Sequence, residues 1–201
     1  MDSPHTIGLF RGPEILPWLE DAARLRISVF REWPYLYDGN FEYERDYLAA
    51  YAQSKESLLV LALDGDEVVG ASTGMPLADS EPAFRQPFVE QGMPVGSVFY
   101  FGESVLLSAY RGRGIGHAFF DSREAHARAL GRFRWTAFCS VDRDAADTRR
   151  PDGYRPNDAF WSNRGYQSRP GMAMRLPWQE AGRGEVDHSL TFWLRELEQA
   201  A

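Results

Sequence analysis

The sequence predicts an α/β protein in which helices cover both faces of a mixed central sheet. Three observations predict this class: apolar residues at helical spacing near the N-terminus, a strand pair around a tight turn, and a later strand that runs through a glycine-rich turn into a long helix. Of the 201 residues, 44% are hydrophobic and 25% charged, the balance of an ordinary globular protein. We expect one domain covering residues 1–201.

The N-terminal part predicts a short strand at Thr6–Phe10 followed by two helices. Pro13 stands where a first helical residue would, and apolar residues from 15 to 29 then follow the spacing of one buried helical face. The aromatic segment 33–39 ends this helix. A second helix is expected around residues 43–51, with three tyrosines on one face.

The rest of the chain predicts a hairpin and then alternating strands and helices, which brings the number of strands to about seven. The Asp64-Gly65 pair predicts a tight turn between strands at residues 58–63 and 68–72. The remaining expected elements are a short helix at 81–91 interrupted by Pro87, a central strand at 98–107, a long helix at 115–130, a strand at 135–141, a short helix at 157–164, and two late strands at 172–176 and 190–194.

The most informative stretch joins the central strand to the long helix. Three glycines, Gly112, Gly114 and Gly116, alternate there with Arg111 and Arg113. The first four N–H groups of a helix lack partners within the helix, and the macrodipole makes that end positive. Glycines leave these amides open to a phosphate, and arginines add charge-assisted hydrogen bonds. The pattern therefore favours a pyrophosphate-binding turn over a tight turn with solvated arginines.

Two common nucleotide-binding motifs do not fit this turn. A Walker loop ends in Gly-Lys-Ser/Thr, whereas Gly116 is followed by His117 and Ala118. The dinucleotide fingerprint needs its third glycine at the position of His117. A dinucleotide-dependent enzyme is therefore disfavoured.

Residues 111–116 (Arg-Gly-Arg-Gly-Ile-Gly) resemble the Arg/Gln-x-x-Gly-x-Gly/Ala signature of the GNAT superfamily of N-acetyltransferases. Residues 157–166 are similar to its second signature, Asn-x-x-(Leu/Phe)-Tyr-x-x-x-Gly-Phe, and the element order matches along nearly the whole chain. The resemblance implies a GNAT-like, mostly antiparallel sheet and acetyl-CoA as co-substrate. The residues that it assigns to the cofactor are Val105, Leu106 and Leu107 for the pantetheine arm, Arg111, Gly112, Arg113, Gly114, Ile115 and Gly116 for the pyrophosphate, and Asn157 for the same arm. Asn157 fits the N-cap of a short helix equally well.

The reaction that the resemblance implies is direct transfer of an acetyl group to a small-molecule or peptide amine. Glu103, on the central strand, is the candidate general base, acting directly or through water; the alternative is an ion pair with an arginine such as Arg134. Trp161 stands where the family carries its proton-donating tyrosine, and an indole is too weak an acid for that role. Tyr154 as the acid, an unassisted thiolate, and a non-catalytic acyl-CoA-binding module therefore stay open.

The acceptor side is expected to be lined by Trp33, Tyr35, Tyr37 and the loop 142–156, as in similar proteins. That loop is long for its position, so we expect it to close over the substrate. Three nearby carboxylates suit a cationic acceptor or simply a solvated loop: Glu32, Asp38 and Glu42. Cys139 is interpreted as a small buried residue rather than a nucleophile, and His117 as an exposed one.

Charge and cysteine content exclude several classes of function. The net charge of −7 disfavours nucleic-acid binding and favours cationic partners. One cysteine allows no intramolecular disulfide and no multi-cysteine metal site, so no metal is expected. Without a long apolar run or signal-peptide pattern, we expect a cytoplasmic protein with no membrane contact. The acceptor, the acyl-chain preference and a homodimer stay open.

Overall fold

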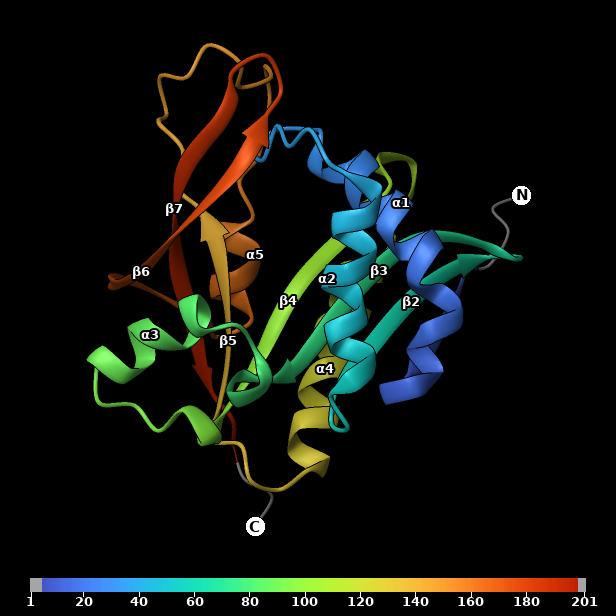
Figure 1. The fold of residues 1–201 in the computed structure, drawn as a ribbon, viewed down its shortest axis with the longest axis vertical. Coiled ribbons are helices and arrows are strands. Elements are labelled where there is room, and N and C mark those ends of the chain that lie inside the picture. The colour runs from blue at the N-terminus through green and yellow to red at the C-terminus, as the bar shows by residue number, and fades with distance from the viewer. Residues whose placement is uncertain (1–4, 199–201) are drawn as a thin grey trace.

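The computed structural model describes residues 5–198, whose strands form one seven-stranded sheet in the order β1-β2-β3-β4-β5-β7-β6 (Figure 1). The strands are β1 (Thr6–Phe10), β2 (Leu58–Asp64), β3 (Glu67–Pro76), β4 (Val98–Leu106), β5 (Trp135–Val141), β6 (Gln167–Glu180) and β7 (Gly184–Glu196). Neighbouring strands run antiparallel except β4 and β5, which are parallel. The predicted mixed, mostly antiparallel sheet is confirmed.

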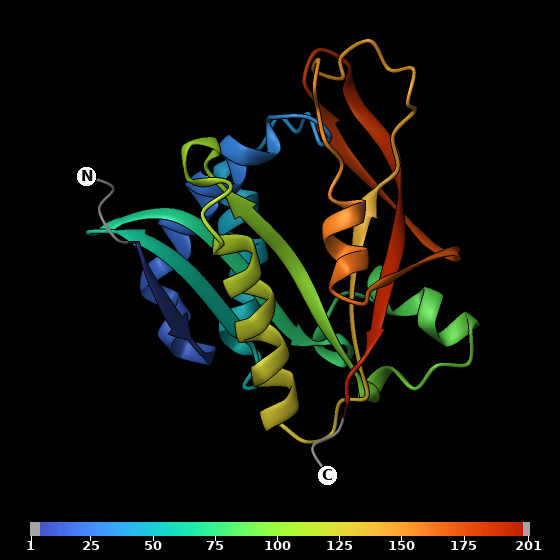
Figure 2. The ribbon, with the colours of Figure 1, turned by 180° about the vertical axis from the view of Figure 1, so that it is seen from behind.

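Helices cover both faces of this sheet. The α-helices are α1 (Leu19–Phe30), α2 (Phe41–Gln53), α3 (Pro82–Glu90), α4 (Ile115–Ala129) and α5 (Asp158–Asn163). The short 3-10 helices are η1 (Gly12–Trp18), η2 (Leu77–Asp79), η3 (Val95–Ser97) and η4 (Ser108–Tyr110). Helices α1, α2 and α3 lie on one face, and α4 and α5 lie on the other, as the two opposite views show (Figures 1 and 2).

Proline accounts for two differences between the predicted and observed helices. The single helix expected from Pro13 is divided into η1 and α1, because Pro17 lacks the N–H group that a continuous α-helix would use there. Pro87 has the opposite outcome, since α3 continues through it to Glu90.

The last two strands are much longer than the expected 172–176 and 190–194. β6 has 14 residues and β7 has 13, and they pair as a long hairpin. Much of β6 alternates exposed with buried residues, and β6 forms an edge of the sheet. Polar residues on the exposed side made this strand look shorter in the sequence than it is.

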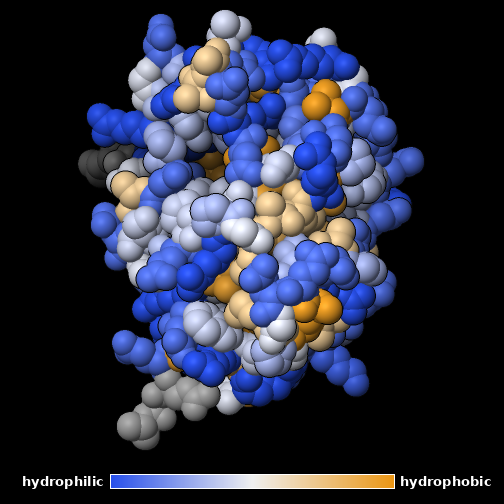
Figure 3. All heavy atoms as spheres, turned by 90° about the vertical axis from the view of Figure 1, so that its left-hand side faces the viewer, coloured by the Kyte–Doolittle hydropathy of each residue, from blue (hydrophilic) through white to orange (hydrophobic). Residues whose placement is uncertain are grey.

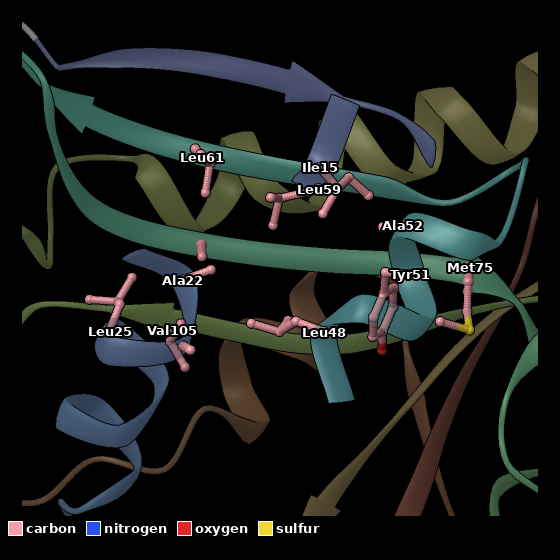
Figure 4. Close-up of a cluster of buried hydrophobic side chains, with 12 residues drawn as sticks. Ile15, Ala22, Leu25, Leu48, Tyr51, Ala52, Leu59, Leu61, Met75 and Val105 are labelled. Carbon is pink, nitrogen blue, oxygen red and sulfur yellow. The ribbon is translucent and has the colours of Figure 1, made fainter. Parts of the chain in front are cut away.

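The α1–α2 layer is held on the sheet by a cluster of buried apolar side chains (Figure 4). The labelled members are Ile15, Ala22, Leu25, Leu48, Tyr51, Ala52, Leu59, Leu61, Met75 and Val105. They come from η1, α1, α2 and the three strands β2, β3 and β4. Burial of this apolar area fixes α1 and α2 over the middle of β4.

A β-bulge in β4 changes which side chains face this layer. Between the pairs Ser72↔Ser104 and Gly74↔Phe101, β3 contributes only Thr73, whereas β4 contributes both Gly102 and Glu103. The extra residue shifts the alternation of β4 by one position. Glu103 therefore points toward α1, where Arg26 binds it, instead of toward α4.

The bulge is stabilised from the opposite face by Arg123 of α4. This side chain is 1% exposed, and its Nη1 donates to the carbonyls of Thr73 and Glu103, each at 3.2 Å. Its Nη2 donates to Ser104 Oγ at 2.9 Å, and its guanidinium lies 4.1 Å from the ring centroid of Phe101. Burial lowers the pKa of Arg123 to about 10, so the group remains a cation at neutral pH.

β4 and β5 pair over three residues and then separate. The paired positions run from Val98↔Trp135 to Tyr100↔Ala137. Beyond them, within the described residues, β4 pairs only with β3 and β5 only with β7, and the two strands spread apart in Figure 1. The side of β4 that faces β5 therefore has open backbone groups from Phe101 onward.

The surface over β6, β7 and α3 is mostly hydrophilic, with separate small hydrophobic areas (Figure 3). The large exposed apolar side chains in the described part of the chain come from different elements: Leu9, Leu16, Tyr43 and Val89. Within residues 5–198, no helix has the length and apolar character needed to cross a membrane.

The bulge predicts that Gly102 tolerates no side chain. A Cβ there would lie 1.9 Å from Tyr51 Oη and 2.5 Å from Thr73 Oγ1. We expect Gly102→Ala to lower the free energy of unfolding by about 1–3 kcal/mol in urea denaturation. Gly96→Ala is the matched control, because its Cβ would meet nothing within 4 Å and its stability should change little. Tyr51→Phe should restore part of the stability of Gly102→Ala, and no recovery would argue against this clash.

Candidate active site

The glycine-rich turn leads from the end of β4 into α4. Gly112 and Gly114 have φ values of +78° and +83°, which favour glycine, and Gly114 is the N-cap of α4. A Cβ at either position would meet nothing within 4 Å. The N-terminus of α4 has no side-chain cap and no acidic residue in its first turn. Its first amides therefore have no capping side chain, which is the state in which helix N-termini bind phosphate groups.

The two arginines of the turn are exposed and already have interactions. Arg111 donates through Nη2 to Glu32 at 2.8 Å and through Nε to the carbonyl of Leu106 at 3.3 Å. The guanidinium of Arg113 lies 5.0 Å from the centroid of the Tyr110 ring. Glu32, which suited either a cationic acceptor or a solvated loop, thus pairs with the glycine-rich turn.

The predicted pantetheine segment lies where β4 and β5 diverge. Its three residues differ in burial and in the direction of their backbone N–H groups. The Val105 side chain is fully buried under α1 and α2. Leu107 lies beyond the end of β4, and its N–H donates to the carbonyl of Val69 at 3.0 Å. Backbone direction alternates along a strand, so Leu106 turns its N–H toward the open side. Of the three, Leu106 is the residue whose N–H can pair with an extended ligand, while its carbonyl accepts from Arg111.

Glu103 lies on the α1–α2 face of the sheet in a buried network of polar groups. Its Oε2 accepts from Arg26 Nη1 at 2.6 Å and from Tyr47 Oη at 3.4 Å. Arg26 also donates to Glu44, and its guanidinium lies 4.4 Å from the Tyr47 ring centroid. Burial acts to lower the pKa of Arg26, but the carboxylates hold it above its usual value. Arg26 is therefore a cation that pairs with both Glu103 and Glu44.

The two carboxyl oxygens of Glu103 differ in their hydrogen bonding: Oε2 has two donors, Arg26 and Tyr47, whereas within residues 5–198 Oε1 has none. Oε1 is buried and has no hydrogen-bond partner within the described residues. A buried carboxylate oxygen without a donor is unfavourable, so a water or a ligand N–H group is needed to satisfy it. This atom is the clearest sign of a ligand position on the α1–α2 face.

The sequence offered Arg134 as the structural partner of Glu103, and that alternative is wrong. Arg134 precedes β5 and pairs with Glu196 at 2.8 Å. The bulge turns Glu103 toward α1, so Arg26 binds it instead. Arg26 was missed, although a charged residue within the apolar run of α1 was a usable signal. Tyr47 and Tyr51 do share one face of α2, as their spacing predicted, while Tyr43 is 61% exposed.

Cys139 and His117 have surroundings that suit structural roles. The Cys139 sulfur lies 3.3 Å from Tyr100 Oη, and burial raises the pKa of the thiol to about 12. The thiolate needed for a nucleophile is therefore negligible at neutral pH. His117 is exposed, accepts from Arg164 at 3.2 Å and contacts the edge of the Phe160 ring.

The second predicted signature forms α5. Trp161 packs against Phe138 and Trp193, with ring centroids 5.0 and 5.2 Å away, so an aromatic core contact occupies this position. Asn157 is at the N-cap of α5, but its exposed side chain makes no capping hydrogen bond. Tyr154 is half-buried, its ring meets Trp33 edge-on at 6.2 Å, and burial raises its pKa.

The aromatic residues predicted to line the acceptor side are half-buried and packed against other side chains. Tyr35 packs between Phe30 and Trp178, and burial raises its pKa. Burial and the neighbouring Glu44 raise the pKa of the Tyr37 phenol, and Glu44 binds Arg26, which also binds Glu103. Among the expected acidic residues, Asp38 pairs with Arg31 at 2.7 Å.

Comparison with known proteins identifies the family. A model of the acetyltransferase (GNAT) family matches residues 21–148. The Salmonella typhimurium protein yncA, solved with its cofactor acetyl-CoA, has a TM-score of 0.59 at 14% identity and covers 100% of this chain and 97% of its own. An acetyltransferase from Thermus thermophilus has a TM-score of 0.57 at 17% identity, covering 98% and 100%.

A GCN5-related N-acetyltransferase from Kribbella flavida is also similar, with a TM-score of 0.54 at 18% identity, covering 95% of this chain and 98% of its own. No curated protein matches the sequence. At these identities the structural likenesses show the fold, whereas the family match covers more than half of the chain. The chain belongs to the GNAT family and is an acetyltransferase that uses acetyl-CoA.

Proposed function

We propose that this enzyme transfers the acetyl group of acetyl-CoA directly to the nitrogen of a small-molecule or peptide amine. The observation that carries the proposal is the buried Glu103 carboxylate, whose Oε1 lacks a donor within the described residues. It lies on β4, the strand that diverges from β5, and β4 ends at the turn with the open helix N-terminus. One strand thus connects a place for phosphate to a place for a proton acceptor.

Each part of the predicted cofactor site has a role in the proposal. The amides of the turn and of the start of α4, at residues 111–116, hold the pyrophosphate, and the open space above Gly112 and Gly114 supports this. Leu106 pairs with the pantetheine arm, and exposed Asn157 contacts it. Acetyl-CoA supplies the acetyl group as an activated thioester.

Glu103 assists the amine. An amine with the pKa of lysine is almost fully protonated at pH 7, and removing its proton costs about 4.6 kcal/mol. The Glu103 carboxylate accepts this proton, directly or through a water on Oε1. Direct transfer is supported by Cys139. A thiol with a pKa of about 12 has almost no thiolate at neutral pH, so it attacks the thioester too slowly to form an acyl-enzyme.

No phenol occupies the place of the family's proton donor. Trp161 is fixed there by aromatic packing, and burial raises the pKa of the Tyr154 phenol. We therefore infer that the thiolate leaves without a proton from the enzyme. A free thiol has a pKa of about 8.5, so its release as the thiolate costs only about 2 kcal/mol at pH 7.

Two broader features belong to the same proposal. Residues 1–201 form one domain, since every strand of the described part joins one sheet. The protein works in the cytoplasm, where a lone free cysteine stays reduced. The net charge of −7 favours a cationic acceptor.

The proposed activity is tested by release of free thiol from acetyl-CoA in the presence of spermidine, phenethylamine or a peptide with a free α-amino group. Acetylation of at least one amine, confirmed by mass spectrometry, is the expected result. Coenzyme A binding in a thermal-shift assay without turnover of any of the three would count against transfer to amines of these kinds.

Gly114→Ala should weaken coenzyme A binding by about tenfold or more in isothermal titration, because a methyl group there restricts access to the amides of α4. Gly131→Ala is the matched control: it lies just past the other end of α4, at φ +72°, with open space around its Cβ. Both variants lose about 1–3 kcal/mol of stability from the left-handed backbone. Equal affinity in the two variants would show that this turn does not bind the cofactor.

Glu103→Gln should lower kcat by about 10²–10⁴ at neutral pH, with a smaller loss at high pH, where the free amine is already abundant. Glu44→Gln is the comparison, since Glu44 binds the same arginine and is equally buried. Any loss in that variant should not diminish with rising pH. A Glu103→Gln profile parallel to that of the wild type would remove Glu103 from proton transfer.

Tyr154→Phe tests the unassisted departure of the thiolate. We expect kcat to change less than about threefold, because only the phenolic proton is lost and the ring still packs on Trp33. Steady-state kinetics at pH 7, with coenzyme A affinity as the folding control, give the answer. A loss of about a hundredfold in kcat alone would make Tyr154 the general acid.

A further inference from the structure

A second buried carboxylate lies apart from Glu103, at the end of β6. The Glu180 side chain is fully buried, and its Oε2 accepts from Arg143 Nη1 at 2.7 Å. Arg149 binds the other oxygen, Oε1. His188 is stacked on Trp178, and its Nε2 lies 3.3 Å from Glu180 Oε2. Burial acts to raise the pKa of Glu180, but the arginines hold it below its usual value, so the group is ionised.

Arg143 connects this carboxylate to the loop between α1 and α2. Its Nε donates to the carbonyl of Pro34 at 2.5 Å, and its Nη2 donates to the carbonyl of Tyr35 at 2.8 Å. The Arg143 side chain is only 12% exposed. One guanidinium thus joins three segments: the α1–α2 loop, the loop after β5, and the β6–β7 hairpin.

Other contacts hold two of these segments together without Arg143. Trp178 Nε1 donates to the carbonyl of Tyr35 at 3.2 Å, and Ala181 N donates to that of Leu36 at 2.7 Å. The loop after β5 reaches the α1–α2 loop through the hydrogen bonds of Arg143 and through the edge contact of Tyr154 with Trp33. The Arg143 guanidinium also lies 5.5 Å from the centroid of the Trp33 ring.

The ion pairs of Glu180 argue against the expectation that the loop 142–156 closes over the substrate. Arg143 and Arg149 fix its first half to Glu180, and the Asp142 carboxylate accepts from Ser189 Oγ at 2.7 Å. A loop held by buried ion pairs is a wall with a set position rather than a lid. The side chains that this wall positions include Trp33, Tyr35 and Tyr154.

We propose that Arg143 is a positioning residue that sets the affinity for the acceptor amine by fixing the α1–α2 loop against the loop after β5. This inference rests on the proposed function, because it assigns Trp33 and Tyr35 to the acceptor side. The planar guanidinium is essential: it presents separate donors to two carbonyls and a carboxylate, which a lysine ammonium cannot do in the same geometry. The positive charge of Arg143 stabilises Glu180. The fixed directions of its N–H donors hold the α1–α2 loop against the loop after β5.

Two substitutions separate charge from geometry. Arg143→Lys keeps a cation beside Glu180 but loses the paired donors to Pro34 and Tyr35, and Arg143→Gln loses both. We expect both variants to raise the KM for the acceptor by about tenfold or more, equivalent to about 1.4 kcal/mol. The melting temperature should fall clearly only in Arg143→Gln. The Kd of coenzyme A should stay unchanged in both.

Arg175→Gln is the matched control, because Arg175 pairs with Asp187 at 2.6 Å on the same hairpin but is 65% exposed. It should change neither KM nor stability noticeably. The acceptor in this assay is whichever of spermidine, phenethylamine and the peptide the wild type acetylates best. An acceptor KM for Arg143→Lys equal to that of the wild type would overturn the inference and leave Arg143 with a role in charge alone.

Hydrogen–deuterium exchange tests the positioning itself, whatever the activity. In both variants the amides of residues 33–37 and 142–149 should exchange faster, while those of the turn 108–116 stay unchanged. Unchanged exchange in residues 33–37 would overturn the inference even in an active enzyme. Absence of turnover by the wild type would defeat the proposed function alone, because the exchange measurement would still decide whether Arg143 holds the wall.

Discussion

The geometry of the site depends on the bulge in β4 and on the arginine that stabilises it. A sheet with regular alternation would turn Glu103 toward α4, away from the acceptor side. The guanidinium of Arg123 satisfies the carbonyls of Thr73 and Glu103 at the irregular position, so the bulge leaves neither group without a donor. Gly102 completes the arrangement, because the hydroxyl of Tyr51 occupies the space where a side chain would be.

The open edge of β4 and the glycine-rich turn after it belong to the same stretch of chain. After Tyr100, β4 leaves β5 and remains paired with β3, so its backbone on one edge is open to an extended ligand. A few residues later the chain enters α4 through Gly112 and Gly114, both with a left-handed backbone, and the N-terminus of the helix has no side-chain cap. The proposed positions for proton transfer and phosphate binding thus lie on one strand and on the turn that follows it.

Local patterns in the sequence predicted the fold and the turn, because helical spacing, hairpin residues and alternating glycines act over a few positions. The surroundings of Glu103 could not be predicted in the same way, since they depend on the pairing of β3 with β4 and on side chains from α1 and α2. Alternation alone gave no reason to choose Arg26 over Arg134. The fixed position of the loop 142–156, which the sequence predicted to close over the substrate, could not be predicted for the same reason. The hydrogen bond from Arg143 to Glu180 joins residues 37 positions apart.

Three arginines with little exposure each hold one part of the proposed site. Arg26 binds two carboxylates in front of β4. Arg123 binds the carbonyls of Thr73 and Glu103 and the hydroxyl of Ser104 behind it, and Arg143 binds two carbonyls and a carboxylate at the proposed acceptor side. Lys55 is the only lysine in the chain, so 21 of its 22 basic residues are arginines. An ammonium is a compact and strongly hydrated charge, whereas a guanidinium is planar, less hydrated, and can donate in several fixed directions. Each of these places needs several acceptors satisfied at once in a nearly dry interior, and for that reason the same side chain recurs at all three.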